Sequence, residues 1–273
     1  MTGASGNVGG QVARLLAEQG GAEVVAISRR PAELPSTVIA RTADYGRLDS
    51  LRTSFADIDT LVFVSSDGEA TRVLAHHFNV VSAARDCGVR HIVALSSVDA
   101  DTDSPFCYAV TNGFTEQAIH DTGCGYSIVR ASIFVEFLRH FLVPARSTGQ
   151  ISLPDGDGRV GLVSRADVAR CLSALARSAP SGRCHEVTGP IALDMADAAA
   201  TAAEVWGRPA VYQPIGAAEH IGQLAPTEDP WWLYAYSSMF ASIREHRWGR
   251  VTAEVQHLTG RAPLTLADVL DAG

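Results

Sequence analysis

The sequence predicts an α/β fold with a doubly wound, mainly parallel sheet, and three observations support this prediction. Apolar runs of strand length alternate with amphipathic stretches through the first half of the chain. A glycine-rich segment stands directly before the first amphipathic stretch. The 273 residues suffice for one large core with a smaller attachment. We expect the core over residues 1–131, and over residues 132–273 a mixed region that completes the sheet, forms a small, mostly helical substrate cap and belongs to the same structural unit.

The first half of the chain contains runs typical of buried strands, over 23–28, 60–65, 91–96 and 126–131. Helical patterns lie around them, over 8–19, 48–55, 71–87 and 114–121. A shorter run over 37–41 predicts an edge strand. Because parallel strands need crossover connections, this order predicts helices on both faces of the sheet.

The alternation weakens after residue 132. We expect helices over 136–147 and 166–177, a strand over 160–163, and a strand over 184–188 that returns to the main sheet. Three further helical patterns, over 194–206, 217–224 and 231–246, are expected to form the cap over the strand ends.

Composition excludes several classes of site. All 22 residues counted as Lys+Arg are arginine, so a Walker-type phosphate loop, a Schiff base and a Tyr-Lys proton relay are excluded. The formal charge of −8, with scattered arginines, argues against a nucleic-acid partner. The five cysteines contain no C-x-x-C pair, so we expect reduced thiols and no metal site. Since no apolar run has the length of a membrane span, we expect a cytoplasmic protein without a membrane partner.

Residues 2–10 read TGASGNVGG, in which Gly3, Gly6 and Gly9 are spaced G-x-x-G-x-x-G directly before a helix. Such glycines permit a tight turn, bring backbone N–H groups close to a pyrophosphate, and let the helix pack with its positive N-terminal dipole facing the anion. The pattern predicts a Rossmann-like dinucleotide site. A purely structural turn is the alternative.

Arginines follow the strand over 23–28, in the stretch Ser28-Arg29-Arg30-Pro31. An acidic residue in this place would bind the ribose hydroxyl of NAD, whereas a guanidinium matches a phosphate in bidentate fashion. We therefore expect NADP(H) to be preferred over NAD(H). Solvated loop arginines are the alternative.

Over nearly its whole length the chain resembles the NmrA-like group of atypical short-chain dehydrogenase/reductases, which includes NAD(P)H-dependent quinone and azo-dye reductases. Beyond the glycine loop and the arginines, the resemblance rests on residues 43–45 (ADY), 64–66 (VSS), 94–97 (ALSS), 115–119 (TEQAI), 126–130 (YSIVR), 163–169 (VSRADVA), 258–263 (LTGRAP) and 266–268 (LAD). The order and spacing of these motifs together are specific to the group.

The resemblance implies a set of cofactor-binding residues. Those expected to line the pyrophosphate are Gly3, Ser5, Gly6, Asn7 and Val8. Arg29 would meet the adenosine phosphate, Asp44 would approach the adenine, and Ser65 and Ser66 would lie beside the adenosine ribose or the pyrophosphate. Ser96 and Ser97 would border the nicotinamide. For the serines, local hydrogen bonds that end a strand are an equal alternative.

The chain departs from the group at its start. This fold normally opens with an apolar strand that leads into the glycine loop, but Met1 directly precedes Thr2. The first strand therefore looks truncated. We expect that the reading frame starts upstream or that the chain is a truncated product with impaired cofactor binding.

A second departure concerns the catalytic residues, expected to be Tyr108, Ser96 and Asn112. Typical short-chain dehydrogenases protonate a carbonyl with a tyrosine that a lysine four residues later activates, and here Asn112 stands in the place of that lysine. An uncharged amide leaves Tyr108 a weak acid at neutral pH, which disfavours carbonyl reduction. A quinone needs less help, because solvent can protonate its delocalised hydroquinone anion. Tyr108 is therefore a proton donor or a wall of the substrate pocket.

A third departure replaces the Arg-Pro and Met-Glu-Asn of the group by Arg130-Ala131 and Val135-Glu136-Phe137, which leaves the polarity of the substrate open. Aromatic residues that could form an acceptor pocket are Phe134, Phe137, Trp231, Trp232, Tyr234 and Tyr236. Packing in the core or cap is the alternative for them.

Together these features predict an oxidoreductase that passes hydride from NADPH to a small-molecule electron acceptor, quinone-like or otherwise conjugated. The alternatives are a redox sensor of the NmrA-like type that binds the cofactor without turnover, and the truncated product. A homodimer is common among relatives, but the apolar residues over 71–84 fit an interface and a core equally.

Overall fold

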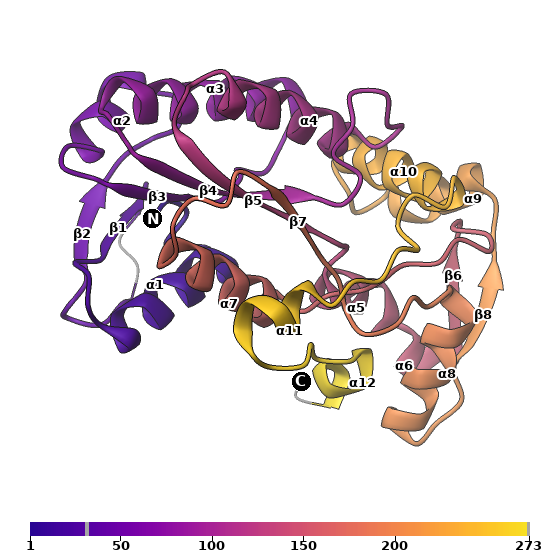
Figure 1. Ribbon diagram of the computed structural model, residues 1–273. Helices are drawn as coiled ribbons and strands as arrows, with labels where there is room; N and C mark the ends of the chain where they lie inside the picture. Colours follow the sequence, from indigo (N-terminus) through magenta and orange to yellow (C-terminus); the bar gives the residue numbers. More distant parts are fainter. Residues whose placement is uncertain (31–32, 272–273) are drawn as a thin grey trace. The chain divides into compact units, whose positions relative to one another are not determined.

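The computed structural model describes residues 1–30 and 33–271 and confirms the α/β fold (Figure 1). Pro31, the last residue of the arginine stretch, lies outside the described residues. The chain divides into two compact units. Unit 1 consists of Met1–Ser96, Thr111–Arg130 and Arg165–His185, and unit 2 of Ser97–Val110, Ala131–Ser164 and Glu186–Gly273.

Unit 1 contains the parallel sheet and its flanking helices. Its strands are β1 (Val25–Ser28), β2 (Ile39–Thr42), β3 (Thr60–Phe63), β4 (His91–Ser97), β5 (Gly125–Ala131) and β7 (Cys184–Val187), the last three of which extend by one or two residues into unit 2. Its helices are α1 (Asn7–Gln19), α2 (Leu48–Ser54), α3 (Ala70–Asp86), the later turns of α4 (Cys107–His120), and α7 (Arg165–Ala176). The pattern of apolar runs therefore predicted these elements to within a few residues, except for the start of α4.

The sheet of unit 1 is built from a pair and a group of four. β1 pairs in parallel with β2, and the other strands follow in the order β3-β4-β5-β7. Between the two parts, Ile27 N donates to Met1 O at 2.8 Å and Thr2 N donates to Val62 O at 2.9 Å. Met1 and Thr2 thus connect β1 with β3, at the place where the fold has its first strand.

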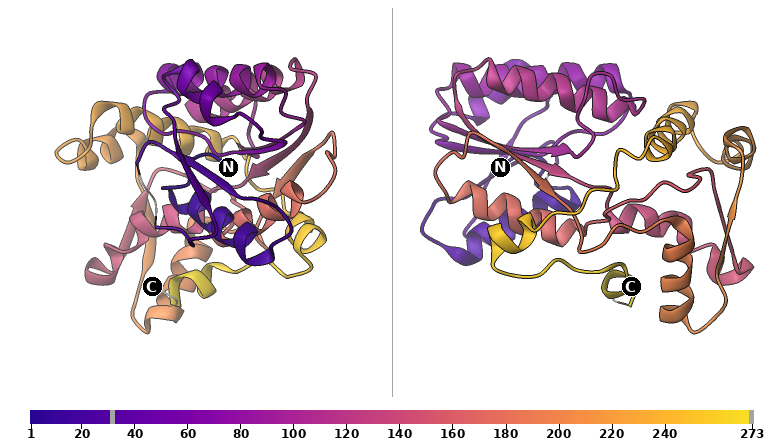
Figure 2. Two further views of the ribbon diagram at one scale, coloured as in Figure 1. Left: turned by 90° about the vertical axis from the view of Figure 1, so that its left-hand side faces the viewer. Right: turned by 45° about the vertical axis from the view of Figure 1, so that its right-hand side comes forward.

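Helices lie on both faces of this sheet. The views of Figures 1 and 2 agree that α2 and α3 cover one face, while α1 and α7 cover the other. The apolar side chains of strands and helices meet in a core whose fully buried members include Leu51, Phe55, Leu61, Ile92 and Ile128. Burial of this apolar surface holds the strand ends, and the loops that follow them, in fixed positions.

Unit 2 is mostly helical, as expected of the cap. Its elements are α5 (Val135–Leu142), α6 (Ala145–Thr148), β6 (Gln150–Leu153), α8 (Met195–Trp206), β8 (Val211–Pro214), α9 (Ala217–Leu224), α10 (Pro230–Arg244), α11 (Glu254–Thr259) and α12 (Leu266–Asp271). β6 and β8 form a parallel pair that the sequence did not predict, since each strand has four residues. Their core includes Leu142, Ile151, Phe240 and Trp248.

Three predicted elements differ from the structure. The strand over 160–163 is wrong, because Val160 bridges to Leu193 and Val163 to Phe134, and two separate partners make no continuous ladder. The helix over 136–147 is divided into α5 and α6 near Pro144, which lacks the N–H that a continuous helix needs. α4 begins at Cys107 and not at residue 114, because the structure overrides the weak helix propensity of the Asn112-Gly113 pair.

No helix in the described part of the chain is long and apolar enough to span a membrane.

A buried carboxyl group makes unit 2 sensitive to pH. Asp155 has no exposed surface; its Oδ1 accepts a hydrogen bond of 2.7 Å from the Tyr212 hydroxyl, while its Oδ2 has no hydrogen-bond partner among the described residues. Burial raises the pKa of Asp155 from 3.8 to about 6. Folding therefore favours the protonated acid.

We predict that this acid makes the protein less stable as the pH rises. The pKa of Asp155 is higher in the folded protein than in the unfolded chain. Its contribution to the free energy of unfolding is therefore complete below pH 3.8 and is lost as the pH rises through about 6. Asp155→Asn keeps an acceptor for Tyr212 and removes the charge, so it should raise the free energy of unfolding at pH 8 by about 2 kcal/mol and by much less at pH 5. Urea unfolding at both pH values measures this. Asp157→Asn, at a side chain that is 93% exposed, is the control, and equal gains at the two pH values would contradict the assignment.

Candidate functional site

In the glycine loop between Thr2 and α1, the first turn of the helix packs closely against the backbone of Gly3. Gly3 has φ +65°, which only glycine adopts without strain, and Gly6 N donates to Gly3 O at 2.9 Å. A Cβ at Gly9 would lie 2.1 Å from Gly3 O. The bare Cα of Gly9 therefore allows α1 to begin directly against the loop, so the predicted spacing has a physical cause at Gly3 and Gly9.

The N-terminus of α1 faces a cavity of about 380 Å³. The N-cap residue Gly6 supplies no side-chain cap, and Ser5, Gly6 and Asn7 are exposed. Residues that line this cavity are Ala4, Ser5, Gly6, Asn7, Gly10, Gln11, Arg14 and Glu33. Backbone N–H groups at a helix N-terminus, without a carboxylate in the first turn, fit a pyrophosphate. The side chain of Val8, also predicted to line the pyrophosphate, is buried.

The other predicted cofactor residues follow the carboxyl ends of three neighbouring strands. Arg29 comes directly after β1 and is exposed. Asp44 follows β2 and accepts from Gly46 N at 2.9 Å. After β3, the Ser65 hydroxyl donates to Leu95 O at 3.2 Å, and Ser66 Oγ lies 3.3 Å from His76 Nδ1. Ligands of open α/β sheets bind at this edge, so the structure brings these residues to the edge expected for the adenosine end.

Residues missed by the sequence analysis contact these loops. The Tyr45 hydroxyl donates to Val64 O at 2.8 Å, which joins the loop after β2 to the end of β3. His76, on α3, contacts the Tyr45 ring with centroids 6.3 Å apart. The only sequence signal for His76 was a pair of histidines on an amphipathic helix, which by itself favoured packing.

A partly buried ion pair of Arg130 and Glu116 contacts Ser96. Arg130, on β5, donates to both carboxylate oxygens of Glu116, on α4, at 2.5 to 3.2 Å, and the Ser96 hydroxyl donates to the same carboxylate at 2.5 Å. Cys184 on β7 donates its thiol to Glu116 at 3.7 Å, and burial raises the pKa of that thiol. The hydroxyl of Ser96 is thus held by Glu116, which suits a positioning role better than proton transfer.

Tyr108 and Asn112 lie one turn apart on α4, Tyr108 within unit 2 and Asn112 within unit 1. The indole N–H of Trp231 donates to the Tyr108 hydroxyl oxygen at 3.4 Å. The rings of Phe106, Trp231 and Trp232 surround the Tyr108 ring at centroid distances of 5.7, 6.2 and 6.4 Å. Tyr108 therefore belongs to an aromatic group of unit 2, and the neutral indole N–H of Trp231 donates to its hydroxyl oxygen.

This aromatic group includes most of the residues expected to form an acceptor pocket. Trp232 stacks on Tyr236 with centroids 5.9 Å apart, and Phe137 lies 5.8 Å from Tyr236. Tyr234 contacts Trp231 at 5.4 Å and is 55% exposed. Tyr236 and Phe137 also pack against the core of unit 2, so packing and contact with a flat ligand are both open to them.

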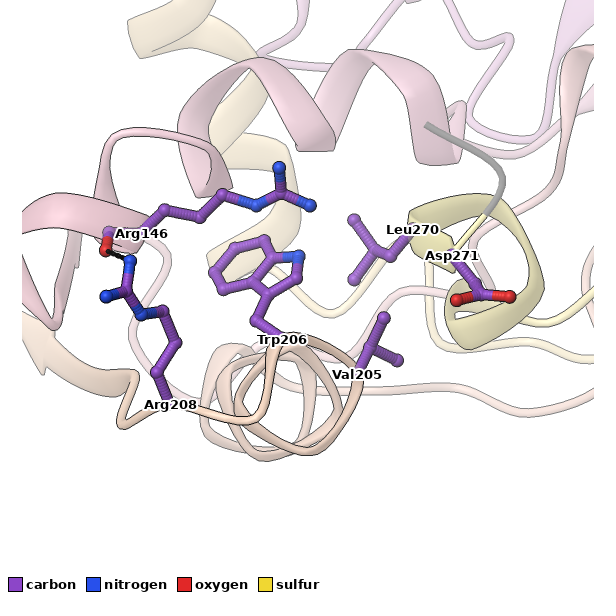
Figure 3. Close-up of a pocket in the computed structure, with 6 residues that line it drawn as sticks. All are labelled: Arg146, Val205, Trp206, Arg208, Leu270 and Asp271. Atoms are coloured by element: carbon purple, nitrogen blue, oxygen red, sulfur yellow. Dashed lines mark hydrogen bonds between the residues drawn. The ribbon is translucent and has the colours of Figure 1, made fainter.

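A second cavity of about 380 Å³ lies in unit 2 (Figure 3). Its lining residues are Arg146, Val205, Trp206, Arg208, Leu270 and Asp271. The Arg146 guanidinium lies 5.1 Å from the centre of the Trp206 ring, and Arg208 donates to Arg146 O at 2.9 Å. These contacts join α6 to the end of α8, and none of the predicted site residues lies among them.

Comparison with known proteins agrees with this geometry. The family described as NAD(P)H-binding matches residues 3–179. The chain is 28% identical over 230 residues to quinone oxidoreductase 2 of Escherichia coli, which covers 82% of this chain and 80% of the relative. It is also 28% identical over 185 residues to an NmrA-like family domain-containing oxidoreductase of Aspergillus flavus, which covers 64% of this chain and 60% of the relative.

Among solved structures, the NADPH-dependent quinone oxidoreductase of Escherichia coli in complex with NADPH superimposes with a TM-score of 0.91 at 26% identity. The match covers 99% of this chain and 98% of that one.

We predict that Gly9→Ala disrupts the loop. The added methyl group would lie 2.1 Å from a backbone oxygen that cannot rotate away, so the substitution should lower stability by about 1–3 kcal/mol and abolish dinucleotide binding. Thermal unfolding and calorimetry with NADPH measure the two effects. Gly222→Ala, in α9, meets no atom within 4 Å and should leave both unchanged or slightly raise stability. Normal nucleotide binding by the Gly9 variant would overturn this account of the loop.

Proposed function

Because the chain belongs to the NAD(P)H-binding family and is an NAD(P)H-dependent oxidoreductase of the NmrA-like group, we propose that it uses NADPH to reduce a flat, conjugated acceptor of the quinone type. The observation that carries this proposal is the exposed, uncapped N-terminus of α1 at the same sheet edge as Arg29. Together they supply N–H donors for a pyrophosphate and a guanidinium for a further phosphate.

The preference for NADPH rests on charge. The loop after β1 begins with Arg29 and Arg30, both exposed, where an acid that accepts from a ribose hydroxyl would stand; Glu33, further along the same loop, lines the cavity at the N-terminus of α1. A guanidinium gains a charge-assisted hydrogen bond from a 2′-phosphate and little from a neutral hydroxyl. Asp44 approaches the adenine in this proposal, with its carboxylate held by Gly46 N.

A bound nicotinamide would supply the hydride. The protein's own residues bind the acceptor and protonate its reduced form. The aromatic group around Tyr108 offers flat, apolar faces for offset stacking. Tyr108 donates a proton to the reduced acceptor, with its oxygen held by Trp231. Quinones suit this set, because a hydroquinone anion needs only a weak acid.

One observation favours a second candidate, a sensor that binds NADP(H) without turnover. The hydroxyl of Ser96 is held by Glu116, and Asn112 brings no charge to Tyr108, so two of the three proposed catalytic residues lack the usual chemistry of a reductase. A homodimer and a cytoplasmic location belong to either proposal.

We predict that Arg29→Ala weakens NADPH binding about tenfold to 100-fold, which corresponds to the loss of a charge-assisted hydrogen bond, and leaves NADH binding nearly unchanged. Calorimetry with both nucleotides measures this. Arg30→Ala is the matched control, because it removes the neighbouring charge without the residue that the resemblance assigns. An equal loss of affinity for NADPH and NADH would show that Arg29 does not bind the 2′-phosphate.

We further predict that the protein oxidises NADPH with quinones above the uncatalysed rate and with simple ketones far more slowly. Absorbance at the nicotinamide band measures both. Tyr108→Phe should lower kcat for a quinone with a smaller effect on KM, since the ring faces are kept and only the proton is lost. NADPH binding without turnover of any acceptor would favour the sensor, and an unchanged kcat would make Tyr108 a pocket wall.

A further inference from the structure

His76 lies where two cofactor loops meet. Its Nδ1 is 3.3 Å from the Ser66 hydroxyl, which belongs to the loop after β3. On the other side of the ring, a methyl group at Gly46 would lie 3.5 Å from His76 Nε2 and 3.4 Å from Asp44 Oδ1, so Nε2 and this carboxylate border the same turn after β2. His76 thus contacts both loops that carry the proposed adenosine residues.

The charges around His76 are mostly positive. Arg29, Arg72 and Asp44 act on it electrostatically, and Arg72 stands one turn earlier on α3. Burial lowers the pKa of His76 below 6.5, with Asp44 opposing the two arginines, so the ring is mostly neutral at pH 8. Two further titratable neighbours carry no charge there: burial lowers the pKa of His77 to about 3 and raises that of Tyr45.

We propose that His76 is a pH-dependent recognition residue for the adenosine 2′-phosphate, acting with Arg29 and Arg72. The inference rests on the proposed use of NADPH and adds two residues to the phosphate end of the site. With neutral His76, the three charged groups that act on it electrostatically, Arg29, Arg72 and Asp44, sum to a charge of +1; protonation of the ring raises this sum to +2. The negative charge of Asp44 repels a phosphate. The positive charge that His76 gains on protonation offsets this repulsion.

Linkage fixes the direction of the effect. If the protonated imidazole favours the phosphate, then the bound phosphate favours protonation by the same factor, so binding takes up a proton near neutral pH. The 2′-phosphate gains its second negative charge as pH rises, which pulls affinity the opposite way. In a variant without the imidazole, the ionisation of the 2′-phosphate changes affinity with pH just as it does in the wild type. Comparison of the two proteins therefore isolates the effect of the imidazole.

The test uses adenosine 2′,5′-bisphosphate, with adenosine 5′-monophosphate as the matched ligand without the 2′-phosphate. Calorimetry from pH 5.5 to pH 8 compares the wild type with His76→Gln, which keeps a polar side chain beside Ser66, and with Arg72→Gln. His120→Gln, at an exposed residue of α4, is the control for loss of a histidine elsewhere in unit 1. Repeating the titrations at pH 6.5 in buffers of different ionisation enthalpy gives the number of protons taken up.

We expect the affinity of the wild type relative to His76→Gln to rise about three- to fivefold from pH 8 to pH 5.5 for the bisphosphate, and not for the monophosphate. Proton uptake should be lower in His76→Gln than in the wild type and His120→Gln. Arg72→Gln should weaken bisphosphate binding at every pH.

Two outcomes separate the failures. If the wild type prefers the bisphosphate and His76→Gln keeps the same pH profile and proton uptake, the role of His76 is wrong while the use of NADPH stands. If the wild type shows no preference for the bisphosphate at any pH, the proposed NADPH preference fails, and the inference with it. If His76→Gln does not fold, the pKa of the His76 imidazole is measured in the wild type by proton NMR. Binding of the bisphosphate must raise this pKa, and an unchanged pKa would overturn the role of His76.

Discussion

The ion pair of Glu116 and Arg130 joins α4 to the strands of unit 1. Glu116 is 4% exposed, and its carboxylate holds Arg130 on β5, Ser96 on β4 and Cys184 on β7, so one side chain of α4 ties the helix to three strands. Removal of the Arg130 charge would leave the buried Glu116 carboxylate without its partner, which costs far more than the loss of a surface pair. The positions of these strands therefore depend on a charged contact as well as on apolar packing.

This pair also limits the chemistry of the site. Because the Ser96 hydroxyl donates its proton to Glu116, that proton is not free for transfer to an acceptor. In a chain without lysine, the side-chain cations that are charged at every pH near neutrality are arginines. Arginine is always charged, so it serves the phosphates and the buried pair well but transfers no proton. Reduction of an acceptor that needs little acid assistance is the chemistry that such a set of residues supports.

The parts of the fold that could be predicted from the sequence are those set by local pattern. The glycine spacing has its cause within eight residues, in the approach of Gly9 to Gly3 O, and apolar runs mark the strands because parallel strands are buried on both faces. The early start of α4 was hidden by Asn112-Gly113, whose weak helix propensity is overcome by tertiary packing. β6 and β8 were missed because each strand is short and its partner lies about 60 residues away.

The missed site residues share one physical cause. His76 and Glu116 sit on helices whose own sequence says only that they are amphipathic, and their partners come from other elements: Ser66 from the loop after β3, Arg130 from β5. A one-dimensional pattern reports the burial of a helix face but not which polar group of a neighbouring strand it meets. Arg29 could be proposed from its position at a strand end in a doubly wound sheet, and Asp44 from the family resemblance; both roles remain predictions. The proposed charge recognition at the adenosine end thus combines residues placed by strand order, which a sequence reveals, with residues placed by helix packing, which only the fold reveals.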